Sequence, residues 1–217
     1  LFDGSDVGIT KNVNAFYRQD RTGAPDIFYL NFVANQSIPG LGVVAAHDVV
    51  KFTPTALGST TAGSFELYFD GSDVGLTTSA ERIDALGMAG NQLLISVVGN
   101  GSVPRSGGGN LAFADEDVVA FTPTTTDATT AGTWAAYFDG STVAGLAAED
   151  VNGFYDDPAS GDLYISLVNA FNLGGVTGDA DDIVRLTPGG GSYTASVVRN
   201  GDDTGHTVAL DAFELAP

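Results

Sequence analysis

One tetrapeptide, Phe-Asp-Gly-Ser, occurs three times in this chain at nearly equal intervals. It begins at Phe2, Phe69 and Phe138, so that successive copies lie 67 and 69 residues apart. A second pattern, an aspartate followed by two β-branched residues and then by Thr-Pro, keeps step with the first; it begins at Asp48, Asp117 and Asp182. A fixed period of this size indicates one supersecondary unit that is used about three times.

The middle copy shows what each unit contains. Residues 64–69 alternate between apolar and polar and are rich in aromatics, which predicts a strand that ends at Asp70-Gly71. Residues 82–86 alternate again, and the almost continuously apolar residues 92–98 predict a strand buried on both faces. After a glycine-rich stretch at 99–114, which we expect to be a loop, residues 117–121 predict the next strand. Apolar residues at helical spacing do not persist anywhere, so we expect little helix.

The other copies repeat this order of strands. The sequence therefore predicts an all-β, propeller-like array of three four-stranded antiparallel repeats of about 68 residues, with a partial strand at each end. We place the whole array in one domain, 1–217, with repeats at about 8–70, 76–139 and 146–200 and an extra strand at 205–214. A β-sandwich or a parallel solenoid is the alternative, which the long period disfavours.

The order "IDAL", "QLLISVV", "DVVAFTP" and "FELYFDGSDVGL" resembles the repeats of six-bladed propellers in secreted bacterial proteins. The resemblance covers nearly the whole chain, and it departs from the pattern at the ends and in the third copy, at 141–146. It implies a propeller fold. It implies no particular activity, because propellers host many unrelated functions.

Charge and composition exclude several kinds of partner. The chain has 27 acidic and 8 basic residues, a net charge of -19, so nucleic acids and anionic membrane surfaces would repel it. It has no cysteine and hence no disulfide or thiolate site, and no apolar run is long enough to cross a bilayer. The cysteine-free, Thr- and Gly-rich, acidic composition leads us to expect a secreted or cell-surface protein.

Two sets of aspartates are candidate ligands for calcium, the one cofactor we consider. The Asp-Gly-Ser-Asp turn at Asp70 and Asp73 offers alternate oxygens around a glycine, although a tight turn capped by the aspartate is the favoured interpretation. The second set precedes the third strand of its repeat and comprises Asp115, Asp117, Asp179 and Asp181. Crowded carboxylates repel one another unless they are solvated or bound to a cation, so this set favours calcium more.

Nothing in the sequence marks a catalytic centre. The two histidines, His47 and His206, occupy different places in the repeat, there is no Gly-x-Ser-x-Gly elbow, and no carboxylate pair stands out for glycoside hydrolysis. We therefore expect no enzymatic activity, and a hydrolase remains a third, unsupported class.

Aromatic residues and sequons offer further candidates. Four aromatics at equivalent strand positions are expected to pack between sheets: Phe65, Tyr68, Trp134 and Tyr137. Three near loops are candidates for a glycan-binding surface: Tyr17, Tyr155 and Phe171. Asn35 and Asn100 match the N-glycosylation pattern and fall in equivalent loops, which we expect to be exposed.

Incomplete strands at both ends suggest what the protein does, because unpaired strand edges pair with other chains. We expect a non-enzymatic extracellular structural or adhesive protein that self-associates through strand edges into a homo-oligomeric ring or a head-to-tail polymer. The alternative is a carbohydrate- or protein-binding propeller module, stabilised by calcium. The sequence leaves open that this chain is a piece of a longer repeat protein.

Overall fold

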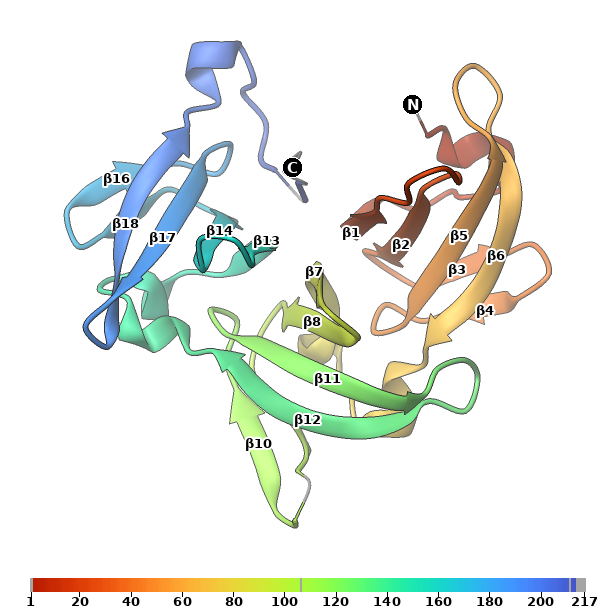
Figure 1. The fold of residues 1–217 in the computed structure, drawn as a ribbon, viewed down its shortest axis with the longest axis horizontal. Coiled ribbons are helices and arrows are strands. Elements are labelled where there is room, and N and C mark those ends of the chain that lie inside the picture. The colour runs from red at the N-terminus through yellow and green to blue at the C-terminus, as the bar shows by residue number, and fades with distance from the viewer. Residues whose placement is uncertain (1, 106, 211, 214–217) are drawn as a thin grey trace.

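Three four-stranded antiparallel sheets make up the protein in a computed structural model that describes residues 2–105, 107–210 and 212–213 (Figure 1). The first sheet contains β1 (Val13–Gln19), β2 (Ile27–Phe32), β5 (Val49–Ala56) and β6 (Ala62–Phe69). The second contains β7 (Ile83–Ala89), β8 (Gln92–Val97), β11 (Val118–Thr125) and β12 (Ala131–Phe138). The third contains β13 (Val151–Asp157), β14 (Asp162–Leu167), β17 (Ile183–Gly189) and β18 (Ser192–Arg199). The all-β, propeller-like repeat predicted from the sequence is confirmed.

The sheets, called blades from here on, surround a common centre. Figure 1 shows β1, β7 and β13 nearest the centre and β6, β12 and β18 at the periphery. Strand β7 contacts both β1 and β13, and we call the place where these three strands meet the axis. The described part of the chain begins and ends on the side of the molecule between the first and third blades (Figure 1).

A small hairpin interrupts each blade between its second and third strands. The hairpins are β3–β4 (Gln36–Ile38 and Gly42–Val44), β9–β10 (Gly101–Pro104 and Asn110–Phe113) and β15–β16 (Phe171–Leu173 and Val176–Gly178). The expectation of a plain loop at 99–114 was therefore wrong. The hairpin forms because Gly101 leaves room for a ring: a Cβ at Gly101 would lie 2.3 Å from an atom of Phe113.

The same arrangement corrects the prediction for Phe171. A Cβ at Gly178 would lie 2.4 Å from its ring, and Phe171 is only 5% exposed within the core that the second and third blades share. It is a packing residue and does not belong to a binding surface.

Helical structure is limited to short 3-10 turns in the described residues, as expected. They are η1 (Gly4–Val7), η2 (Gly71–Val74), η3 (Ser79–Glu81), η4 (Gly140–Thr142), η5 (Leu146–Ala148) and η6 (Asp202–Thr204). None of these turns has the length and apolar character needed to cross a membrane.

The two ends continue the repeat without forming regular strands in the described residues. The N–H of Leu210 donates to the carbonyl oxygen of Ala180 at 2.9 Å. The first residues of the second and third blades make the equivalent bonds, Ile83 to Ala46 at 3.1 Å and Val151 to Asp115 at 3.0 Å. The described part of 205–214 therefore enters the place of a fourth inner strand.

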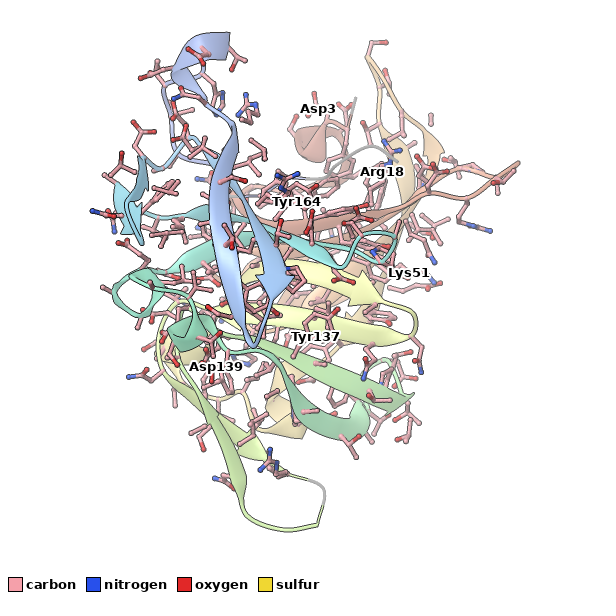
Figure 2. The ribbon with its side chains drawn as sticks, turned by 60° about the vertical axis from the view of Figure 1, so that its left-hand side comes forward. Asp3, Arg18, Lys51, Tyr137, Asp139 and Tyr164 are labelled. Atoms are coloured by element: carbon pink, nitrogen blue, oxygen red, sulfur yellow. The ribbon has the colours of Figure 1, made fainter. Side chains whose placement is uncertain are left out.

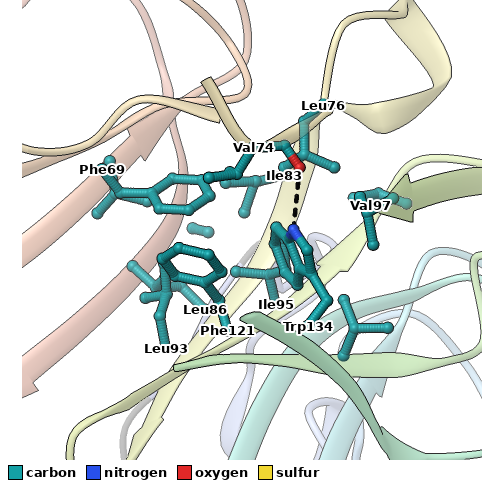
Figure 3. Packing of buried hydrophobic residues seen from close by; sticks show 14 of the residues in the cluster. Phe69, Val74, Leu76, Ile83, Leu86, Leu93, Ile95, Val97, Phe121 and Trp134 are labelled. Carbon is teal, nitrogen blue, oxygen red and sulfur yellow. Dashed lines mark hydrogen bonds between the residues drawn. The ribbon is translucent and has the colours of Figure 1, made fainter. Parts of the chain in front are cut away.

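Apolar residues fill the space between neighbouring blades. Figure 3 shows the core shared by the first and second blades, where Trp134 is 4% exposed and donates its indole N–H to the carbonyl of Val74 at 3.0 Å. The ring of Phe121 lies 4.8 Å from that of Trp134 and 5.2 Å from that of Phe69. The expected packing role of Trp134 between blades is confirmed.

Candidate functional site

The Asp-Gly-Ser-Asp turns use their carboxylates to hold the backbone. Asp70 accepts from the N–H and the hydroxyl of Ser72, at 3.0 and 2.7 Å. Asp73 accepts from the N–H of Thr130 at 2.9 Å. Asp3 and Asp139, the equivalents of Asp70, lie beside their own short turns (Figure 2). The geometry is that of capped tight turns, and it accounts for the repeated tetrapeptide without a metal ion.

Asp117 joins two segments of the backbone, and we call this arrangement the aspartate clamp. Its Oδ2 accepts from the N–H of Ala114 at 2.9 Å, and its Oδ1 accepts from the N–H of Gly140, also at 2.9 Å. Asp48 and Asp182 make the same pair of bonds in the first and third blades. The clamp explains why the aspartate and the Asp-Gly-Ser turn recur in step.

The glycine of the turn is needed for the clamp to close. A Cβ at Gly140 would lie 2.3 Å from the carbonyl oxygen of Glu116, and one at Gly71 would lie 2.3 Å from that of His47. A side chain at either place would push the turn away from the clamp.

Asp179 and Asp181 do come together, with Asp182. One carboxylate oxygen from each of the three lies within 4.8 Å of the others. A side-chain hydrogen bond with Asp179 raises the pKa of Asp181 to about 6, and burial and the nearby charges add to this effect. Both oxygens of Asp182 are already engaged in its clamp, so the cluster offers a cation fewer free ligands than its composition suggests.

A pocket with a volume of about 250 Å³ lies at the axis. Its polar lining comes from Asn14, Arg82, Asp84, Asp150 and Asn152, and its apolar lining from Val33, Val98, Val168 and Ala209. None of these residues is among the site candidates predicted from the sequence.

The lining repeats from blade to blade. The N–H groups of Val33, Val98 and Val168 donate to the carbonyls of residues 12, 82 and 150 at 3.0 to 3.1 Å, which shows that these positions are equivalent. Asn14, Asp84 and Asn152 are equivalent in the same way, since each is the second residue of an inner strand. The pocket is thus built from the same few positions of three successive blades.

Two of the three equivalent side chains connect neighbouring inner strands. The Nδ2 of Asn14 donates to the carbonyl of Ile83 at 2.7 Å, and the Nδ2 of Asn152 donates to that of Leu210, also at 2.7 Å. Asp84 has no amide group with which to make such a bond. Its Oδ1 is buried and receives no hydrogen bond from a described N–H group or hydroxyl, and its carboxyl group hydrogen-bonds that of Asp150 when one of the two is protonated.

Asp84 and Asp150 form a pair of acids whose ionised forms are disfavoured by burial and by nearby negative charge. Burial, followed by the charge of Asp150, raises the pKa of Asp84 well above its usual range. Burial, followed by the charge of Asp115, raises the pKa of Asp150 to about 7. The Oδ1 of Asp150 likewise receives no hydrogen bond from a described N–H group or hydroxyl, and the Nε of Arg82 is buried without a partner in the described chain. The predicted candidate Asp115 thus acts on the pocket through its charge.

The remaining candidates lie elsewhere. Asn35 and Asn100 are both exposed, directly before β3 and β9, so their predicted glycosylation stays a prediction on accessible sites. Neither histidine lines the axial pocket: His47 lies 3.9 Å from a carboxylate oxygen of Asp48, and the Nε2 of His206 is buried without a described partner.

A signal for the axial pocket was present in the sequence. Aligning the three repeats places a polar residue, Asn14, Asp84 or Asn152, second in every inner strand, where the surrounding pattern is apolar. Polar side chains that recur at one place in a buried strand must converge wherever the strands meet.

No protein-family model, no curated protein and no solved structure matches this chain.

Proposed function

We propose that this chain is a non-enzymatic structural module of the propeller type, secreted or attached to the cell surface, that assembles with further copies of itself. The acidic, cysteine-free composition and the resemblance of the repeats support this setting. The observation that carries the proposal is that the two outward faces of the array repeat the residues of its internal blade interfaces.

The face of the first blade that points away from the second is built to receive a blade. Its Phe16, Phe28, Phe52 and Phe65 occupy the positions that Leu86, Leu93, Phe121 and Trp134 occupy where the second blade packs on the first. The rings of Phe16 and Phe28 lie 6.0 Å apart, and those of Phe52 and Phe65 lie 4.7 Å apart. Phe16 and Phe65 are only half-buried, which leaves apolar surface that another blade would cover.

The opposite face, on the third blade, repeats the surface that the first blade offers to the second. Tyr155 and Tyr164 stand at the positions of Tyr17 and Tyr29, and their ring centroids lie 6.1 Å apart, compared with 6.0 Å for the earlier pair. Tyr164 is labelled on this blade in Figure 2. Tyr29 is 7% exposed under the second blade, whereas Tyr164 is half-buried.

These two faces support a head-to-tail contact between copies. The third blade of one copy has the residues to pack on the first blade of the next, as the first packs on the second. Two copies would form a six-bladed ring, and more copies an open array. We place this contact on the blade faces rather than on the strand edges expected from the sequence, because the complementary residues lie on the faces.

Light scattering tests the proposal. At a chain concentration of tens of micromolar, we expect a mass of two or more times 22.2 kDa, the mass of one chain. Val198, which is 46% exposed on the outward face of the third blade, provides the disrupting variant Val198→Glu. Val43, which is 71% exposed on the β3–β4 hairpin, provides the matched control Val43→Glu. We expect Val198→Glu to be monomeric and Val43→Glu to remain assembled. A folded wild-type monomer would refute the proposal.

A binding module is the second candidate function, which the axial pocket favours. Binding of a glycan by the isolated chain on an array, with no assembly in solution, would support a carbohydrate-binding module in place of the structural one.

A further inference from the structure

We propose that the axial pocket is a binding site for a divalent cation of the calcium type, with Asp84 and Asp150 as its carboxylate ligands. These two residues are not among the candidates that the sequence suggested, and the site does not depend on assembly between copies.

Asp84 departs from the pattern of its repeat. At the equivalent positions, Asn14 and Asn152 donate a hydrogen bond to the next inner strand. An aspartate forgoes that bond when ionised and places a carboxyl group where it is only 5% exposed. A buried carboxylate without a partner is destabilising unless a proton or a cation neutralises it. Departures of this kind from a local pattern are expected at functional sites.

The carboxyl groups of Asp84 and Asp150 lie in the same cavity. No described N–H group or hydroxyl donates to the buried Oδ1 atoms of Asp84 and Asp150, whose carboxyl groups hydrogen-bond each other when one of them is protonated, and both residues line the pocket. Asn14 uses only its Nδ2 in the bond to Ile83, which leaves its amide oxygen as a further ligand. The volume of about 250 Å³ also holds several waters, so the remaining positions of a six- to eight-coordinate ion can be filled.

Charge selects a divalent ion. Three carboxylates act in this region, those of Asp84 and Asp150 in the lining and that of Asp115 close by, and the guanidinium group of Arg82 also lines the pocket. A cation that displaces the protons of Asp84 and Asp150 meets three negative charges and one positive charge, a net of two negative charges, which a divalent ion neutralises. The potential ligands are oxygens, and neither histidine lines the pocket, so the donor set suits calcium or magnesium rather than zinc.

A calorimetric titration of the chelator-treated chain with calcium chloride, repeated with magnesium chloride, tests the site. We expect one ion per chain and at least a tenfold loss of affinity in Asp84→Asn and in Asp150→Asn. Asp84→Asn should fold, because asparagine stands at the two equivalent positions. Asp181→Asn, in the separate acidic cluster of the third blade, is the matched control and should bind within twofold of wild type.

Absence of binding heat and of any calcium-induced change in melting temperature in the wild type would overturn the proposal. So would loss of binding in Asp181→Asn with binding retained in Asp84→Asn. Manganese soaked into wild-type crystals provides a readout that needs no variant. We expect its anomalous peak between Asp84 and Asp150, at about 2.1 to 2.6 Å from their oxygens. A peak only at Asp179 and Asp181 would contradict the assignment.

Discussion

Replacing Asp117 should separate a structural role from a metal-binding one. Its two oxygens each accept a backbone N–H at 2.9 Å, from Ala114 and from Gly140. Hydrogen bonds to a charged group contribute about 1.5–3 kcal/mol each. Asp117→Ala removes both bonds and leaves two donors without a partner, so we expect the free energy of unfolding to fall by about 3–6 kcal/mol. Asp117→Asn keeps one acceptor oxygen, and we expect a loss of about 2 kcal/mol.

Urea unfolding, followed by the fluorescence of Trp134, the single tryptophan, measures these differences. The experiment is done with a chelator and again with excess calcium. If Asp117 acts as a clamp, its substitution lowers the stability equally in chelator and in calcium. If Asp117 is a calcium ligand, its substitution lowers the stability more when calcium is present. Asp20→Asn is the control: its side chain is 61% exposed, and surface substitutions of this kind change stability by less than about 0.5 kcal/mol. The clamp argument fails if Asp117→Asn unfolds at the urea concentration of the wild type, or if its defect appears only with calcium.

Three further predictions concern packing and charge. Gly140→Ala should lower the free energy of unfolding in urea by about 1–3 kcal/mol, because the added Cβ would overlap a carbonyl oxygen. Gly189→Ala is the control and should match the wild type, because its Cβ meets nothing within 4 Å. Equal losses in the two variants would contradict this prediction. Trp134→Phe should lower the free energy of unfolding by about 1–2 kcal/mol, because the buried carbonyl of Val74 loses its donor. Urea unfolding followed by circular dichroism measures this loss. An unchanged unfolding midpoint would show that the bond contributes nothing. The third prediction is a pH dependence in chelator. Folding raises the pKa of Asp150 from 3.8 to about 7, so the folded chain binds more protons than the unfolded chain in that window and stability falls as pH rises through it. The raised pKa of Asp84 acts in the same direction. The full shift of Asp150 corresponds to about 4 kcal/mol, and partial exposure and coupling reduce the expected loss to about 2 kcal/mol. Asp84→Asn should flatten the curve, and stability that rises from pH 5 to pH 8 would refute the reasoning.

The sequence predicted the sheets because their signals are local. Alternation and the Asp-Gly stop predict β6, an almost continuous apolar run predicts β8, and the period shows that both strands recur. The hairpins were missed because strands of three or four residues are too short for alternation to show. Phe171 was placed on the surface because the sequence does not reveal that Gly178 makes room for its ring.

The axial pocket could not be located from local patterns. Asp84 and Asp150 are 66 residues apart, and each looks like an ordinary polar residue at the start of a strand. Only the meeting of β7 and β13 brings them together, and that contact depends on how whole blades pack. The repeat alignment shows that their positions are special but does not show what the positions face.

Each blade takes all four of its strands from one continuous stretch of chain, with no strand borrowed from a neighbour. Gain or loss of one repeat length in the gene would therefore insert or remove a complete sheet and leave every other strand with its original partner. Copy number can change in a single genetic step without an unfoldable intermediate, so related genes should differ by whole multiples of this repeat.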